Sequence, residues 1–166
     1  MATIRGEDVE ARVGYGNVAR TLARVFGIAF LLVGIAGFIP GLTSNFDDIK
    51  FAGDGSDAEI FGLFQTSILH NIVHLLFGVA GLVMSRRWDR ASNYLLGSGL
   101  IYVLLVVYGL FVGKDDTGGE NFIPLNNEDD VLHGVLALGL LGAWALTRRE
   151  RRASGEPAAV RDTSRR

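Results

Sequence analysis

Long stretches without charged residues are the feature that most constrains this chain. Four such runs contain no Asp, Glu, Lys or Arg: residues 25–42, 60–85, 91–113 and 131–147. A bilayer core about 30 Å thick requires about 20 helical residues, and about 17 to 25 are tolerated. The runs also lack the alternation of a barrel strand, which needs only about 10 residues. The sequence therefore predicts an all-α polytopic membrane protein, a bundle of four transmembrane helices.

The charge-free runs divide the chain of 166 residues into three parts. The transmembrane domain is expected at residues 20–147, with spans at about 22–42, 60–85, 93–113 and 130–147. A cytoplasmic tail, residues 1–19, comes before it. The tail after it, residues 148–166, is basic and polar, which predicts a flexible segment that attracts anionic lipid headgroups.

The distribution of basic residues predicts the orientation, because loops rich in Lys and Arg stay on the cytoplasmic side. Fourteen of the sixteen basic residues lie before the first run, in the loop after the second run or after the fourth run. The first and third loops hold only Lys50 and Lys114, and they carry eleven of the eighteen acidic residues. Both termini are therefore expected in the cytoplasm. Cleavage of the first run as a signal peptide is a competing interpretation, and it leaves the other spans oriented as before.

The residue types present exclude several kinds of chemistry. The chain has no Cys, which excludes disulfides, thiolate metal sites and cysteine nucleophiles. No span carries paired carboxylates or a recognisable nucleophile, so we do not expect an enzyme. The expected partner is the lipid bilayer rather than nucleic acid, and assembly with copies of the chain or with another protein stays open.

Polar side chains interrupt the second run, where hydrocarbon would make them costly without partners. These side chains are Gln65, Thr66, Ser67, His70, Asn71 and His74. On a continuous helix, a stripe would form along one face and turn toward other helices. Its members are Ser67, Asn71, His74, Gly78 and Gly81.

Glycines at helical spacing predict where helices approach closely, because small residues let two backbones come together in a membrane. The first run supplies Gly27, Gly34 and Gly37. The second supplies Gly78 and Gly81. We expect these five residues to serve helix packing.

The fourth run adds His133, close to Asp130. His70 and His133 are nearly the same number of residues from the arginines that end their runs, so both should lie at one depth in the outer half of the membrane. Their helices would run parallel, which allows all three histidines to converge. The candidate functional cluster comprises Gln65, Ser67, His70, Asn71, His74, Asp130 and His133.

Three interpretations of this cluster stay open. Hydrogen bonding between helices would make the protein a non-enzymatic structural or complex-associated membrane component without a cofactor. Because imidazole titrates near neutral pH and binds metals, the cluster could instead serve a carrier or sensor of protons, metal or a small solute. A divalent metal or a haem held by His70, His74 and His133 is the corresponding cofactor, and haem would imply a redox subunit.

A short motif recurs along the chain. Phe38-Ile39-Pro40 follows the first run, Phe122-Ile123-Pro124 precedes the fourth, and Asn and paired Asp come after each copy. This repetition predicts two related helical hairpins in parallel orientation.

The chain resembles a known family at several of these places. The most specific segment is Leu63-Phe-Gln-Thr-Ser-Ile-Leu-His-Asn-Ile-Val-His74, and others are Gly34-Ile-Ala-Gly-Phe-Ile-Pro-Gly41 and Asn121-Phe-Ile-Pro-Leu-Asn126. These segments are similar to a bacterial, largely actinobacterial family of four-helix membrane proteins, domain of unknown function 4383. The resemblance covers residues 20–147 and implies a multi-pass protein of the bacterial plasma membrane. It implies no established activity.

Overall fold

The structure, a computed structural model, describes residues 6–53, 55–111, 123 and 125–153. Four helices make up most of it: α1 (Gly6–Ala36), α2 (Ile68–Met84), α3 (Trp88–Phe111) and α4 (Asn127–Ala153). A short 3-10 helix, η1 (Phe46–Asp48), and three strands lie between α1 and α2: β1 (Thr43–Ser44), β2 (Glu59–Ile60) and β3 (Phe64–Gln65). The mostly helical class predicted from the sequence is confirmed.

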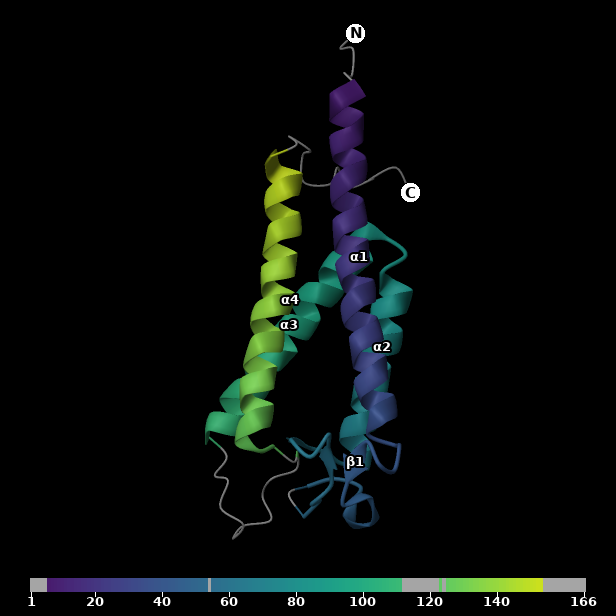
Figure 1. The fold of residues 1–166 in the computed structure, drawn as a ribbon. Coiled ribbons are helices and arrows are strands. Elements are labelled where there is room, and N and C mark those ends of the chain that lie inside the picture. The colour runs from purple at the N-terminus through teal and green to yellow at the C-terminus, as the bar shows by residue number, and fades with distance from the viewer. Residues whose placement is uncertain (1–5, 54, 112–122, 124, 154–166) are drawn as a thin grey trace, which may run out of the picture.

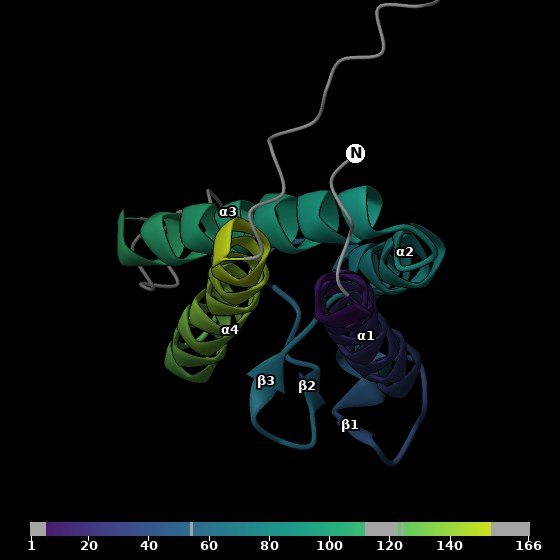
Figure 2. The same ribbon diagram turned by 90° about the horizontal axis from the view of Figure 1, so that it is seen from above.

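The helices form two antiparallel pairs. Figure 1 shows α1 beside α2, and α3 crossing behind α4. Contacts between helices fall mainly within these two pairs, which we call the first hairpin (α1 and α2) and the second hairpin (α3 and α4). Seen from above, the strands lie on the side away from α3 (Figure 2). The two hairpins thus make a bundle with one small sheet at its end.

Three helices are long and apolar enough to cross a membrane: Asn17–Ala36, Trp88–Phe111 and Asn127–Arg149. The fourth apolar helix, α2, is shorter, with 17 residues. Large apolar side chains on the helices face outward, among them Leu76 at 63% exposed and Leu138 at 76% exposed. An apolar outer surface on long apolar helices fits a membrane location.

The predicted second span, residues 60–85, is wrong at its start, because α2 begins at Ile68. Strands β2 and β3 occupy the preceding residues, separated by a turn in which Phe61 and Gly62 have positive φ angles of 56° and 67°. Ser67 then caps α2, and its hydroxyl oxygen accepts a hydrogen bond from the backbone N–H of His70 at 3.2 Å. A short apolar run does not by itself distinguish a strand from a helix.

The other helices also differ from the predicted spans at their ends. Helix α1 ends at Ala36, before the predicted end at residue 42, and it begins at Gly6, inside the predicted tail. Helix α3 begins at Trp88 rather than at residue 93, and α4 continues to Ala153, past residue 147. Residues 112–122 and 154–166, which hold most of the third loop and of the basic tail, lie outside the described residues.

The three strands form one antiparallel sheet in the order β1-β2-β3. The segment around this sheet is tied to the start of α2: the N–H groups of Ile68 and Leu69 donate to the carbonyls of Lys50 and Phe51 at 3.0 and 2.9 Å. The first N–H groups of a helix have no partner within the helix itself. Residues 43–67 therefore supply those partners and cover the end of the first hairpin.

The glycines expected to serve helix packing lie where α1 meets α2. A Cβ on Gly27 would lie 3.0 Å from the carbonyl oxygen of Gly78, and one on Gly81 would lie 2.8 Å from the Cα of Gly27. A Cβ on Gly34 would lie 2.9 Å from the carbonyl oxygen of Asn71, and one on Gly37 would overlap the Asn71 amide. These contacts leave no room for larger residues, so the glycines set the separation of the two backbones.

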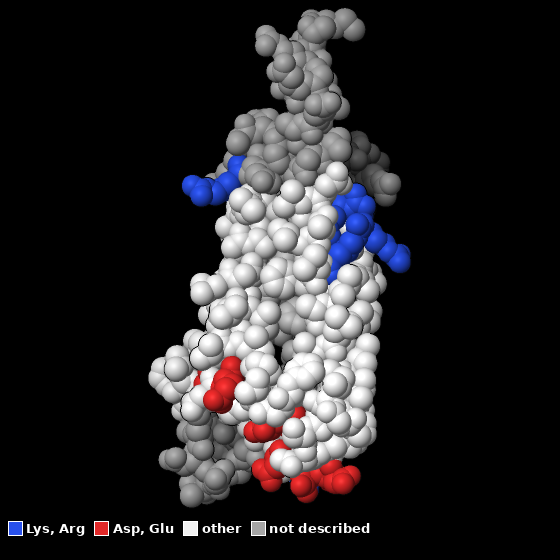
Figure 3. Space-filling model, in the orientation of Figure 1, with Lys and Arg blue, Asp and Glu red and all other residues white. Residues whose placement is uncertain are grey.

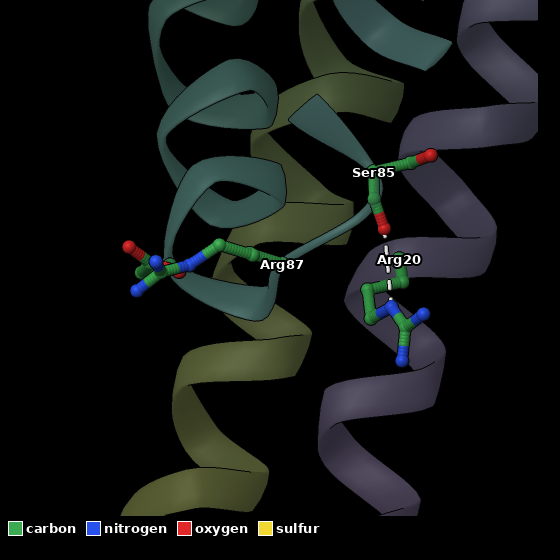
Figure 4. A network of polar contacts seen from close by, with 4 residues as sticks. Arg20, Ser85 and Arg87 are labelled. Carbon is green, nitrogen blue, oxygen red and sulfur yellow. Dashed lines mark hydrogen bonds and ion pairs between the residues drawn. The ribbon is translucent and has the colours of Figure 1, made fainter. Parts of the chain in front are cut away.

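Charges separate along the bundle. Figure 3 shows basic side chains near one end and acidic side chains near the other. At the basic end, the Arg20 Nε donates to the Ser85 carbonyl at 3.1 Å (Figure 4), and the Arg24 Nε donates to the Ser85 hydroxyl at 3.3 Å. These bonds tie α1 to the end of α2. We call the opposite end, with the sheet and the start of α4, the acidic end.

Candidate metal centre between the hairpins

Three histidines converge between the two hairpins, near the acidic end. His70 and His74 lie one turn apart at the start of α2, and His133 lies in the second turn of α4. The Nε2 atoms of His70 and His74 are 3.0 Å apart, and the rings of His70 and His133 are 6.2 Å apart between centroids. One nitrogen from each ring lies within 4.8 Å of those of the other two. The parallel course of α2 and α4 brings about this meeting.

The histidines border a cavity of about 160 Å³. Its wall is mainly apolar, formed by side chains such as Val73, Phe77 and Ile101. The polar groups that reach it come from Ser67, Tyr102 and the three histidines. Ligand sites typically combine an apolar wall with a few converging polar groups.

Two aromatic side chains hold the imidazoles in place. Phe30 of α1 packs edge-on against His74, with ring centroids 5.6 Å apart, and Tyr102 of α3 packs against His133 at 5.2 Å. Phe30 and Tyr102 stack on each other at 5.5 Å with an interplanar angle of 8°. Both are almost fully buried, so the two rings form a rigid wall behind the histidines.

Each histidine has a nitrogen without a hydrogen-bond partner. In the part of the chain that the structure describes, the Nδ1 atoms of His70, His74 and His133 are buried and make no hydrogen bond. Buried polar groups are rarely left in this way, because the loss of water is not compensated. The three residues that carry these nitrogens all border the cavity, which makes it the candidate place for a ligand.

The arrangement suits a divalent transition metal. With metal–nitrogen bonds of about 2.0–2.1 Å, nitrogens in a tetrahedral site are about 3.4 Å apart. Small ring movements would bring donors that lie within 4.8 Å of one another to this separation. Haem fits less well, because its macrocycle would have to stand between rings whose Nε2 atoms are 3.0 Å apart.

Asn71 and Asp130 are close to the histidines in sequence, but neither side chain lines the cavity. The buried Asn71 amide donates to the Gly37 carbonyl at 2.9 Å and accepts from the Thr66 hydroxyl at 2.7 Å. Asp130 lies against Gly109 of α3, where a Cβ would overlap its carboxylate. Both side chains therefore occupy the contact within a hairpin rather than the cavity.

The remaining predicted residues, Ser67 and Gln65, support the site from the sheet side. Ser67 caps α2 and borders the cavity. Gln65 does not reach it: its side chain donates to the Ser56 carbonyl at 2.9 Å, and its backbone N–H donates to Asp129 at 3.0 Å.

Sequence reasoning missed Asp129, Phe30 and Tyr102. The Asp129 carboxylate is 2% exposed and accepts from the backbone N–H of Asn126 at 3.1 Å, and Asn126 accepts in return from the Asp129 N–H at 2.8 Å. This reciprocal pair is a capping box, and its three-residue spacing was a usable signal. Nothing local in the sequence indicates that the two aromatic rings stack.

A family model matches residues 20–146, which include the three histidines and the packing glycines. The chain belongs to this family. Its description is Domain of unknown function (DUF4383). No curated protein and no solved structure matches the chain. Any functional argument for this member of the DUF4383 family therefore depends on the site itself.

Proposed function

We propose that this protein is a four-span plasma-membrane protein that binds a divalent transition-metal ion, of the Zn²⁺ class, through His70, His74 and His133. Metal carriage or sensing is the activity that such a site serves. One observation carries the proposal: the three imidazoles converge at one cavity, and within the described part of the chain each has a nitrogen without a hydrogen-bond partner.

The proposed topology places the basic end and both termini in the cytoplasm. Its support is the separation of charge along the bundle, since basic residues favour the cytoplasmic side. The short helix α2 is the fourth span. With 17 residues at about 1.5 Å each it is about 26 Å long, and residues 43–67 cover its outer end.

The donor set favours an exchangeable ion over a permanent one. Structural zinc sites use four protein ligands, whereas three protein ligands leave one position open to water or another molecule. Neutral imidazole suits zinc, copper, iron and nickel, and an all-nitrogen set disfavours magnesium and calcium. No carboxylate, thiol or lysine is among the described residues that line the cavity, so we propose binding without catalysis.

Titration calorimetry with ZnCl₂ on the chelator-treated protein in detergent tests the proposal. We expect one Zn²⁺ per chain, with affinity weakened at least about tenfold in His74→Gln and His133→Gln. Ile101→Val is the matched control, because it alters the same wall without removing a donor. Equal Zn²⁺ binding by the wild type and by a variant with all three histidines changed to Gln would refute the proposal.

A second candidate is a structural or complex-associated membrane component in which the histidines bond only to each other. The contact of 3.0 Å between the Nε2 atoms of His70 and His74 favours it. In that case the Gln variants would keep their thermal stability, and ZnCl₂ would not raise the unfolding temperature of the wild type.

A further inference from the structure

We infer that the two hairpins are repeats of one structural unit and that the metal ion binds at their junction, holding one repeat against the other. This inference depends on the proposed function for the ion, while the repeat itself depends on geometry alone. Pairs of residues at constant sequence separation occupy matching places in the two hairpins, and they converge on the cluster of histidines.

Helices α1 and α3 correspond at a separation of 72 residues. Phe30 packs against His74, and its counterpart Tyr102 packs against His133. In the same register, Gly37 matches Gly109. Each of these two glycines leaves space that a polar side chain from the other helix of its hairpin fills.

Helices α2 and α4 correspond at a separation of 59 residues. His74 then matches His133, and the two residues that fill the glycine spaces, Asn71 and Asp130, match each other. The caps match as well: Ser67 accepts from the N–H three residues on at 3.2 Å, and Asn126 does the same at 2.8 Å.

Equivalent residues meet at the centre of the molecule. Phe30 and Tyr102 are counterparts, and they stack on each other with nearly parallel rings. Contact between counterparts is what a twofold axis between two repeats produces, and membrane proteins with parallel repeats have such an axis. The Phe-Ile-Pro motif does not mark the repeat, because one copy follows α1 and the other precedes α4.

The repeat is broken at one position of the cluster. The counterpart of His70 is Asp129, which bonds to the backbone of Gln65 and Asn126 instead of facing the cavity. The first hairpin thus offers two imidazoles and the second hairpin one. An ion bound to all three must cross the junction between the repeats.

Most of the junction is apolar packing, in which Phe30 of α1 stacks on Tyr102 of α3. Helix contacts between the hairpins are sparser than those within them. Among the described residues, polar links between the hairpins lie at the acidic end, from the Gln65 N–H to Asp129 at 3.0 Å and from the Asn126 amide to the Leu63 carbonyl at 2.7 Å. Coordination by both hairpins would therefore restrict how one moves relative to the other.

Pulsed electron resonance on spin-labelled protein in nanodiscs tests this coupling, and the chain has no native Cys to interfere. Labels at L76C and L138C report on α2 and α4 across the junction, from exposed positions. Labels at L32C and L76C report within the first hairpin and serve as the control. We expect saturating ZnCl₂ to narrow the distance distribution of the first pair and not that of the control pair. The narrowing should disappear in H133Q.

Calorimetry on the same samples separates the two proposals. Zn²⁺ binding that leaves the L76C–L138C distances unchanged would overturn the inference and leave the proposed function standing. Absence of Zn²⁺ binding would overturn both. The repeat adds a second expectation, that H74Q and H133Q lower the affinity by similar factors. A difference of more than about tenfold between them would contradict the equivalence of the two ligands.

Discussion

At the scale of single residues, two glycines create the space in which buried polar groups find partners. Gly37, the residue after α1, lets the Asn71 amide reach its own backbone carbonyl at 2.9 Å. Gly109 gives Asp130 the same close approach to α3. If the buried Asn71 amide lost this partner, the cost of its desolvation would not be compensated. Gly37 therefore contributes to stability by leaving room for the Asn71 side chain.

Gly37→Ala should therefore destabilise the protein by about 1–3 kcal/mol, because the added methyl group overlaps the Asn71 amide. Gly97→Ala in α3 is the control: a Cβ there meets nothing within 4 Å, and alanine favours the helix by up to about 1 kcal/mol. The unfolding temperature in detergent, followed by circular dichroism, measures both changes. A Gly37→Ala protein as stable as the wild type would contradict the packing described for α1 and α2.

At the scale of elements, the start of α2 determines where two of the three histidines lie. Ser67 ends the segment of residues 43–67 and caps the helix, which places His70 in the first turn. A continuous helix from residue 60 would have no start, and therefore no cap, at Ser67. The cap and the sheet together fix the position of the imidazoles relative to the acidic end.

Ser67→Ala should lower stability by about 0.5–2 kcal/mol, since the His70 N–H loses its acceptor at the helix start. Ser44→Ala, at an exposed position in β1, is the matched control and should change little. Thermal unfolding of both variants in the same detergent gives the comparison. Equal unfolding temperatures for the two variants would show that the cap contributes nothing.

The helices and strands also show how much of the fold could be predicted from the sequence. The apolar runs predicted four helices, because absence of charge over such lengths is a strong signal. Residues 60–67 belonged to one of those runs, yet they form the turn at Phe61 and Gly62, strand β3 and the Ser67 cap before α2 begins. The pattern of apolar residues does not indicate that a phenylalanine has a positive φ angle, so it did not predict the turn or the sheet.

The candidate site was predictable in part. Counting residues from the basic clusters placed His70 and His133 at one depth, because helical rise is uniform. The same counting placed Asn71 and Asp130 beside them, yet those side chains turn toward Gly37 and Gly109. Their direction depends on which helix packs on which face, and that information comes from tertiary contacts.

At the scale of the whole molecule, the separation of charge bears on how the bundle sits in a bilayer. Arg20, Arg24 and the arginines of the turn between α2 and α3 gather at one end, where Arg20 and Arg24 also bond to Ser85. The acidic end carries the sheet. An orientation with the basic end inside is the one that the loop charges favour.

Single cysteines test this orientation directly. K50C lies in the segment near the sheet, and R90C lies at the start of α3. In right-side-out vesicles, a membrane-impermeant maleimide should label K50C and leave R90C unlabelled, and inside-out vesicles should reverse the result. Labelling of K50C from the cytoplasmic side alone would invert the proposed topology.

The short length of α2 bears on the energetic cost of moving a metal ion to the three histidines. Helix α3 has 24 residues and α2 only 17, which makes α2 about 10 Å shorter. In the proposed topology, the resulting hydrophobic mismatch would thin the low-dielectric layer above His70, which is the third residue of its helix. An ion entering from the outer side would exchange its hydration shell for nitrogen donors within about one helical turn of the aqueous boundary. In that topology the electrostatic barrier to entry would be lower on the outer side than on the cytoplasmic side.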